Sequence, residues 1–494
     1  MTNNSPHYRT FAARSKRIFY TFACLMLIAI PQLSFTDSNL PDIGGPASAE
    51  LSLAKEIELG RILIAEVRGH LPISNDPELS QYIHSLGTRI TSGGLNSNFP
   101  FTFLLVFNPN VNAFALPGGI VVINSGLLTL GQQESEVASV LAHEIAHVTQ
   151  RHIARNFANA KSFSVISALT FLGSILVAAY GGSDLGLAAI YTSQGELQQR
   201  QLAYTRSFEK EADRIGMQLL VSANIDPQGM PLFFDRLNKH TQLNRGQIPE
   251  FLSSHPLTLN RVSESKARAN QYQGSFTSNT IHFNYTRART IAISTNPSQI
   301  IDHFRKASKS SGALNDTDNY TYALALNRTG KSQQAIKQLE KIQITADNEV
   351  TIKLAMAQVN IAAGQAYKAK KSLEALDQVY PNNLPIVYYL AASLIEENQA
   401  RNALQKLDQL SSANQQNPAI DQLIAKAASK ANMPWRSHES LSDFYAAHGQ
   451  YGSAMEQIQL SLRSPGIDSN AKARIEAKKS QLREFRQKRE NFKY

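Results

Sequence analysis

The C-terminal half of the chain is organised by a repeat of 34 residues. Three kinds of residue recur at this interval: Gly330, Gly364 and Asn398 at a turn, then Ala335, Ala369 and Ala403, then Leu339, Leu373 and Leu407. Asn can replace Gly here because both tolerate a left-handed backbone. The pattern returns at Gly449, 51 residues after Asn398, one and a half periods on (449 − 398 = 51). We therefore expect one helix to be inserted or missing near Asn432.

A fixed period of 34 residues is typical of tetratricopeptide repeats, in which two helices are joined by a tight turn. One helical pair cannot bury its apolar face alone, so successive pairs stack into a solenoid with a curved binding surface. The sequence predicts such an all-α solenoid over residues 316–490, preceded by a linker helix over 291–315.

The first 35 residues have the pattern of an export signal. Four basic residues, Arg9, Arg14, Lys16 and Arg17, precede an apolar run from Ile18 to Ile30, and no acidic residue occurs among them. Such a charged start and short apolar core predict a secretory signal peptide over residues 1–35. An uncleaved membrane anchor is the alternative, because no clear A-x-A cleavage site follows.

Charge and cysteine content exclude several classes of protein. The net charge is +10, but most of it lies in the N-terminal segment and in the basic tail from Lys472 to Lys493, so a broad nucleic-acid surface is excluded. The tail caps the last helix or makes a peripheral contact with a membrane. The single cysteine, Cys24, excludes an intramolecular disulfide and a four-cysteine zinc site.

Between these ends, the hydrophobic period changes along the chain. Helical spacing over residues 48–68 gives way to short β-rich runs at 101–107, 112–116 and 120–123, followed by helices over 133–156 and 196–222. The sequence thus predicts an α+β layout, with a small sheet set among helices.

One apolar segment leaves two readings open. Residues 162–183 are uncharged and long enough to cross a bilayer, but Gly173, Gly181 and Gly182 interrupt them. They form either a membrane span, which would make the protein membrane-embedded, or a buried or membrane-touching helical hairpin.

His143, Glu144 and His147 form an H-E-x-x-H motif in a helical context. Residues four apart lie on one face of a helix, so both imidazoles can bind one zinc ion. Glu144 can then take a proton from the attacking water. Two solvated helix histidines beside a carboxylate are the alternative, since so short a motif also arises by chance.

A second helical motif supports the metal site. Glu209 and Asp213, in Glu209-Lys210-Glu211-Ala212-Asp213, also lie four residues apart. A catalytic zinc wants three protein ligands, and without a mature cysteine Glu209 is the candidate third. Asp213 can orient a ligand imidazole or donate a proton. Glu211 points away and is expected to be solvated or paired with a lysine.

Two further features lie near these motifs. His152 falls on the opposite side of the helix from His143 and is interpreted as supporting or structural. The strand that contains Asn112, Ala113, Phe114 and Ala115 is a candidate edge strand that pairs with an extended substrate, unless it is internal to a hairpin.

These motifs together resemble the M48 family of zinc metallopeptidases, which implies a zincin-like α+β domain, here over residues 47–290. The resemblance implies one Zn²⁺ per chain on His143, His147 and Glu209, with Glu144 as general base and Asp213 as a further catalytic acid. It also implies a self-inhibitory loop, matched by Ser254-His255-Pro256-Leu257, in which His255 blocks the open metal position.

Family members with a signal peptide and C-terminal tetratricopeptide repeats are periplasmic. Similarity to them implies an endopeptidase in outer-membrane protein assembly and quality control, which degrades misassembled or stalled β-barrel proteins. The repeats would dock such clients and the β-barrel assembly machinery. The alternative is a chaperone-like adaptor in which proteolysis is secondary.

Overall fold

The computed structural model describes residues 51–93, 99–159, 206–243, 249–310, 312–410 and 417–491. The predicted signal peptide and the apolar run at 162–183 lie outside these ranges. Within them, no helix combines the length and the apolar character that crossing a bilayer requires.

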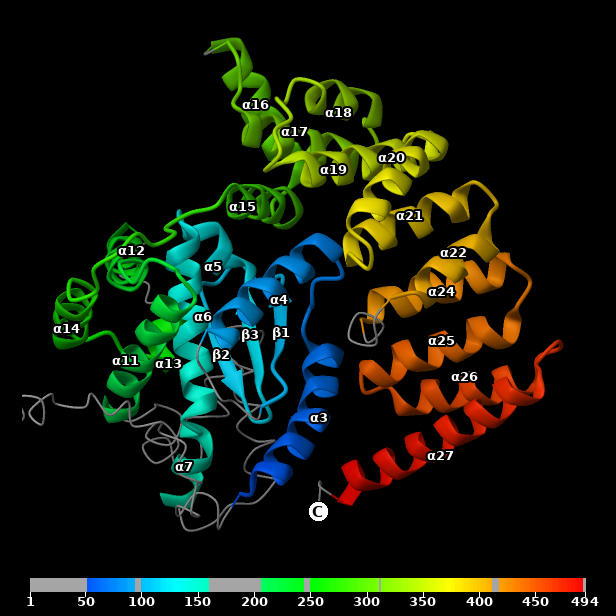
Figure 1. Ribbon diagram of the computed structural model, residues 1–494, viewed down its shortest axis with the longest axis horizontal. Helices are drawn as coiled ribbons and strands as arrows, with labels where there is room; N and C mark the ends of the chain where they lie inside the picture. Colours follow the sequence, from blue (N-terminus) through cyan, green and yellow to red (C-terminus); the bar gives the residue numbers. More distant parts are fainter. Residues whose placement is uncertain are drawn as a thin grey trace, which may run out of the picture. The chain divides into compact units, whose positions relative to one another are not determined.

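The N-terminal half has the predicted α+β layout (Figure 1). Its elements are, in chain order, α3 (Leu53–His70), α4 (Pro77–Ser92), β1 (Thr102–Val106), β2 (Ala113–Leu116), β3 (Ile120–Asn124), α5 (Ser125–Leu130), α6 (Glu134–Thr149), α7 (His152–Asn159), α11 (Arg206–Ser222), α12 (Gly229–Leu243), α13 (Glu250–Ser254) and α14 (Leu259–Ala269).

The three strands form a mixed sheet in the order β1-β3-β2, with β1 parallel and β2 antiparallel to β3. Successive side chains of a strand point to opposite faces. Phe103, Ala115 and Val121 therefore join the core that contains α4 and α6, while Leu104 and Val122 pack against α3. Helices cover both faces of the sheet, and β2 lies at its edge beside α6.

The long helix predicted over residues 133–156 is instead two helices. The chain breaks at Arg151, whose φ of 52° is left-handed, and α7 starts at His152. A buried ion pair accompanies this break: Arg151 Nε lies 3.1 Å from Glu56 Oε2 of α3. The tertiary contact fixes a backbone that an arginine rarely adopts by itself, which is why helical periodicity did not predict the break.

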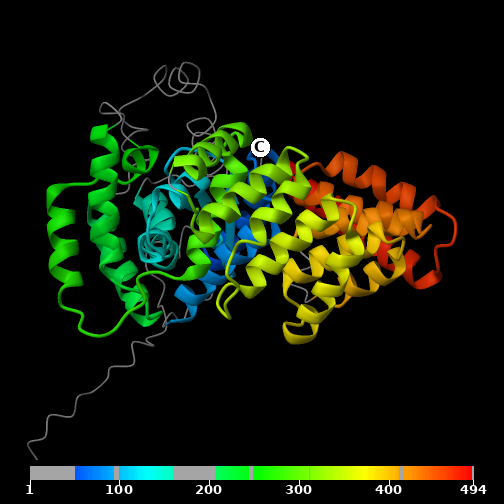
Figure 2. The same ribbon diagram turned by 90° about the horizontal axis from the view of Figure 1, so that it is seen from above.

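Antiparallel helices make up the rest of the described chain, from green to red in Figures 1 and 2. They are α15 (Ile281–Ser294), α16 (Pro297–Ser310), α17 (Asp316–Arg328), α18 (Ser332–Leu339), α19 (Glu349–Ala362), α20 (Ala366–Val379), α21 (Leu384–Glu396), α22 (Ala400–Asp408), α24 (Pro418–Lys430), α25 (Pro434–Ala447), α26 (Tyr451–Arg463) and α27 (Ser469–Asn491).

The 34-residue period continues without interruption through this half. Left-handed residues join the helices of each pair at this spacing, with φ between 58° and 75°: Gly330, Gly364, Asn398, Asn432 and Gly466. The expectation of an inserted or missing helix near Asn432 is therefore wrong. Gly449, with φ of 69°, lies in the turn between α25 and α26, which joins one pair to the next. Both kinds of turn use a left-handed residue, so the sequence pattern did not separate them.

A buried arginine links α4 to the helical pairs. Arg289 of α15 donates to Asp76, the residue that caps α4, with Nε–Oδ1 and Nη2–Oδ2 distances of 2.8 and 2.7 Å. It also donates to the hydroxyls of Tyr320 in α17 and Tyr389 in α21. Its side chain is 2% exposed, so these contacts satisfy a guanidinium that water does not reach.

Candidate metal centre

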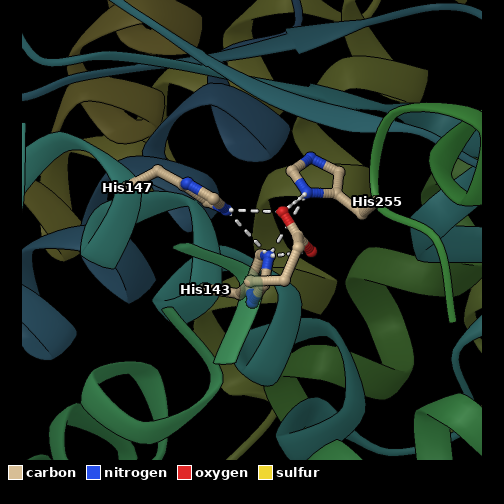
Figure 3. A group of neighbouring side chains, drawn as sticks. His143, His147 and His255 are labelled. Carbon is tan, nitrogen blue, oxygen red and sulfur yellow. Dashed lines mark hydrogen bonds and ion pairs between the residues drawn. The ribbon is translucent and has the colours of Figure 1, made fainter. Parts of the chain in front are cut away.

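Four buried side chains converge beside the sheet: His143, His147, Glu209 and His255. One ligand atom from each lies within 4.8 Å of the other three. Nε2 of His143 is 3.0 Å from Nε2 of His147 and 3.4 Å from Nδ1 of His255, and His255 Nδ1 is 3.0 Å from Glu209 Oε1. The three rings point toward one centre in Figure 3. The structure thus brings the three predicted metal ligands and the predicted loop histidine together.

Close packing of α6 and α11 holds this cluster. Both histidines of the H-E-x-x-H motif lie on one face of α6, and Glu209 lies in the first turn of α11. The helices approach closely at Gly216, where an added Cβ would lie 3.1 Å from the backbone nitrogen of His143. A glycine at this position therefore sets how near Glu209 comes to the two imidazoles.

His143 is oriented from behind by Asp213. Its Nδ1 lies 3.0 Å from Asp213 Oδ1, which leaves Nε2 to face the cluster. Burial lowers the pKa of His143, but its hydrogen bonds to Asp213 and Glu209 outweigh burial and raise that pKa to about 9. Arg261 of α14 donates to both oxygens of Asp213 and holds the pKa of that carboxyl below its usual range against the effect of burial.

His147 is oriented by a second chain of side chains. Its Nδ1 lies 2.8 Å from Nδ1 of His152, whose Nε2 lies 3.1 Å from Glu211 Oε2. Arg155 Nη1 donates to the same Glu211 oxygen at 2.9 Å, and Phe208 stacks on the His152 ring with centroids 4.4 Å apart. Glu211 is thus paired with His152 and Arg155 instead of a lysine, because the break at Arg151 brings α7 against α11.

Glu144 points into the same site and is fully buried. Its Oε1 lies 3.3 Å from Nε2 of His255, and the backbone N–H of Ala115 in β2 also donates to this carboxylate. Burial raises the pKa of Glu144 above its usual value, against the opposing effect of the neighbouring imidazoles. A buried carboxylate with a raised pKa is suited to accept a proton from a molecule bound in this site.

His255 reaches the centre from the segment between α13 and α14. The segment is fastened near β2: the Phe251 backbone N–H donates to the Val111 carbonyl at 3.1 Å. Arg261 Nη1 donates to the Pro256 carbonyl at 2.9 Å, on the other side of His255. The His255 side chain is 1% exposed, so the closed segment covers the atoms that could bind a metal.

The candidate substrate strand lies beside α6 as expected. The Asn112 carbonyl accepts from Asn124 and so faces β3, and backbone direction alternates along a strand. The backbone groups of Ala113 and Ala115 therefore face the edge beyond which no other strand is described. The Phe114 side chain packs toward α3, and all four residues are buried.

Sequence reasoning did not identify two residues of this site, Arg261 and Phe251. An arginine on an amphipathic helix usually faces solvent. A phenylalanine in an apolar run usually belongs to the core. The Pro256 loop contact and the packing of Phe251 against His143 come from the fold alone.

The donor chemistry fits a divalent transition metal. Three imidazole nitrogens and a carboxylate oxygen suit zinc and related ions, and each α6 histidine has a hydrogen-bonded partner that fixes its ring. The carboxylate of Glu144 is buried beside His255 in the same site, which fits a site that receives a polar ligand. The cluster can hold a metal ion.

Comparisons with known proteins agree with this geometry. Residues 76–269 match the model for peptidase family M48. The chain is 37% identical over 285 residues to the beta-barrel assembly-enhancing protease of Escherichia coli K12, covering 57% of this chain and 58% of that relative. A Vibrio cholerae relative named for the same protease is 37% identical over 332 residues, which cover 65% of this chain and 68% of the relative.

Another relative matches a shorter part of the chain. The mitochondrial metalloendopeptidase OMA1 of Saccharomyces cerevisiae is 35% identical over 154 residues, or 31% of this chain and 41% of the relative. The model match contains all four clustered side chains, and the Vibrio cholerae match covers more than two thirds of that protein. The chain belongs to peptidase family M48.

Proposed function

We propose that the protein is a zinc-dependent endopeptidase whose active centre is the cluster of His143, His147 and Glu209. The observation that carries this proposal is Glu144, a buried carboxylate with a raised pKa beside three converging metal-ligand side chains. Family membership and the named endopeptidase relatives support the same reaction, hydrolysis of a peptide bond.

Each residue has a distinct role in this proposal. His143, His147 and Glu209 would hold Zn²⁺, which when bound supplies a Lewis acid that polarises the scissile carbonyl. Glu144 accepts a proton from the attacking water and passes it toward the leaving amine. Asp213 keeps the His143 ring oriented, and His152 does the same for His147. Ala113 and Ala115 hold the substrate backbone in an extended conformation.

His255 acts as an inhibitory fourth ligand in the proposed resting state. Its Nδ1 lies beside Glu209 and its Nε2 beside Glu144, so its ring fills the space between a metal ligand and the base. Substrate and water need that space. Catalysis therefore requires the segment that carries His255 to move aside.

We further infer that the protein acts in the periplasm on outer-membrane β-barrel proteins that are misassembled or stalled. The relatives named for β-barrel assembly support this assignment, as does the export signal in the sequence. The 34-residue helical pairs are interpreted as tetratricopeptide repeats that dock clients or the assembly machinery.

A chaperone-like adaptor is the second candidate. The position of His255 favours it, because a blocked metal centre would let the protein bind clients without cleaving them. A Glu144→Gln protein that fully supports barrel assembly in cells would favour this role over proteolysis.

The decisive experiment measures bound zinc and cleavage of casein and of an unfolded barrel protein by the exported, purified chain. One zinc per chain is expected, with low cleavage in the parent, more in His255→Ala and none in Glu144→Gln. Glu144→Gln should keep its zinc, since Glu144 is not a ligand. Absence of zinc, or cleavage that survives Glu144→Gln, would refute the proposed function.

A further inference from the structure

The segment that carries His255 has a second buried side chain directed at the metal centre. Phe251 lies one helical turn before His255 in α13 and is 3% exposed. Its ring centroid is 4.8 Å from that of His255, 6.3 Å from that of His143 and 6.2 Å from that of Phe233 in α12. Phe251 thus fills an apolar space bordered by the first metal-ligand histidine.

The backbone of Phe251 also uses the sheet edge. Its N–H donates to the carbonyl of Val111, two residues before Ala113 on the chain that leads into β2. Because the direction of the backbone N–H and C=O groups alternates along this strand, those of Val111, Ala113 and Ala115 all face away from β3. An extended peptide paired with this edge would place one of its own N–H groups on the same carbonyl.

The segment therefore makes three contacts of the kind a substrate would make. A backbone N–H binds the edge, an aromatic ring fills the space beside His143, and an imidazole lies among the metal-ligand atoms. Side chains of Asn110 and Asn112 hydrogen-bond Glu250 next to Phe251 and help fasten the segment there.

We propose that Phe251 occupies a specificity subsite, and that the enzyme selects extended segments with an aromatic or large aliphatic residue beside the scissile bond. This inference rests on the proposed function. When the segment withdraws, the space that Phe251 leaves is apolar on the Phe233 side and takes a substrate side chain of similar size. Membrane-spanning β-strands, with alternating apolar residues and aromatic girdles, carry such residues in extended chains.

The first test compares peptides that differ at one position, with Phe, Leu, Ala or Asp next to the scissile bond. Binding is measured by fluorescence anisotropy to the full chain carrying His255→Ala and Glu144→Gln, and cleavage to the chain carrying His255→Ala alone. Phe and Leu peptides should bind about tenfold more tightly than Ala, and Asp should bind least. Phe233→Leu, which widens the space, should shift the preference toward the larger ring.

The outcomes separate this inference from the proposed function. Cleavage with equal rates for Phe, Ala and Asp would overturn the subsite and leave the endopeptidase intact. Binding that prefers Phe, with no cleavage by any variant, would support the subsite while the proposed catalysis fails.

A second test follows the segment without any substrate. The full chain carries Cys24→Ser to remove its own thiol and Phe251→Cys to introduce a new one. The new cysteine should react slowly with a maleimide. Adding His255→Ala should raise the rate of this reaction about tenfold. Ser253→Cys, on the exposed side of α13, is the matched control and should react fast in both backgrounds. The inference fails if, with His255 intact, the cysteine at position 251 reacts as fast as the cysteine at position 253. That result would show that Phe251 is not held in the site.

Discussion

Arg261 and Asp213 form a bidentate ion pair, in which Nε and Nη2 of the guanidinium each lie 2.8 Å from one carboxylate oxygen. The remaining nitrogen, Nη1, lies 2.8 Å from Glu209 Oε2 and donates to the carbonyl of Pro256. One cation on α14 thus contacts the proposed metal ligand Glu209, the residue that orients the proposed ligand His143, and the loop that carries His255. Movement of that loop and the geometry of the ligands are mechanically coupled through this side chain.

Arg261→Lys should weaken both zinc binding and cleavage. A lysine ammonium is a point charge and cannot donate in parallel to both oxygens of Asp213. We expect zinc affinity to fall by about tenfold or more, measured by competition with a chromophoric chelator. Arg214→Lys is the matched control, because Arg214 is the exposed neighbour of Asp213 on α11. Equal affinities for the two variants would contradict the role given to Arg261.

His152→Phe should lower zinc affinity by about 10–100-fold, the usual effect of losing a residue that orients a metal ligand. A phenyl ring keeps the stacking on Phe208 but offers no atom to Nδ1 of His147. Glu211→Gln, which retains an oxygen for His152, should cost much less. The measurement is again chelator competition, together with circular dichroism to show that the fold persists. Unchanged affinity in His152→Phe would rule out its orienting role.

Gly216→Ala should separate α6 from α11 at the metal centre. The added Cβ would lie 3.1 and 3.2 Å from the His143 nitrogen and the Ala142 carbonyl oxygen, closer than backbone normally allows. We expect a lower melting temperature and weaker zinc binding. Gly452→Ala in α26 is the control, because its Cβ meets nothing within 4 Å and alanine favours a helix. The expectation fails if Gly216→Ala melts no lower than Gly452→Ala.

Asp421→Asn should remove a pH dependence of stability. Burial, with Asp443 nearby, raises the pKa of Asp421 from 3.8 to about 8. The folded chain then binds a proton that the unfolded chain releases, so this group makes the free energy of unfolding fall as pH rises from about 4 to about 8. Below pH 8 the neutral Asp421 resembles Asn. In the unfolded parent Asp421 ionises above about pH 4, so the variant should match the parent only below about pH 4 and should unfold at a higher urea concentration than the parent at pH 6, by a wider margin at pH 9.

The exposed Asp347→Asn serves as the control for that experiment and should follow the parent at both pH values. A parent and an Asp421→Asn variant that lose stability equally between pH 6 and pH 9 would show that Asp421 stays charged in the folded chain.

Sequence spacing placed the metal-ligand residues because each motif is local. His143 and His147 lie one turn apart on one helix, and Glu209 and Asp213 on another, so helical geometry fixes each pair before any tertiary contact forms. A small sheet set among helices was likewise predicted from the change of period near Pro100, but its mixed pairing was not. What spacing could not give was the distance between the two motifs, which depends on the close packing at Gly216.

The features that sequence missed depend on contacts across long separations. Arg151 adopts a left-handed backbone because Glu56, 95 residues earlier, binds its side chain. From the sequence alone, Phe251 is expected to be an ordinary core residue. The structure shows that its ring also packs against His143. In the repeats, Ser437 occupies the position at which an alanine would continue the pattern. The sequence pattern therefore favours Gly449, and not Asn432, as the next repeat turn.

The guanidinium of Arg289 couples the unfolding of the N-terminal half of the described chain to that of the helical pairs. Its partners lie at the N-terminus of α4 on one side and in α17 and α21 on the other, and the Arg289 side chain itself is 2% exposed. Pulling α4 away from these helices would strand a charge in an apolar environment, a cost of several kcal/mol. Heat or denaturant should therefore melt the peptidase and helical halves in one cooperative transition, and a fragment that ends before α17 would keep the Asp76 ion pair but lose the hydroxyls of Tyr320 and Tyr389 that accept from Arg289.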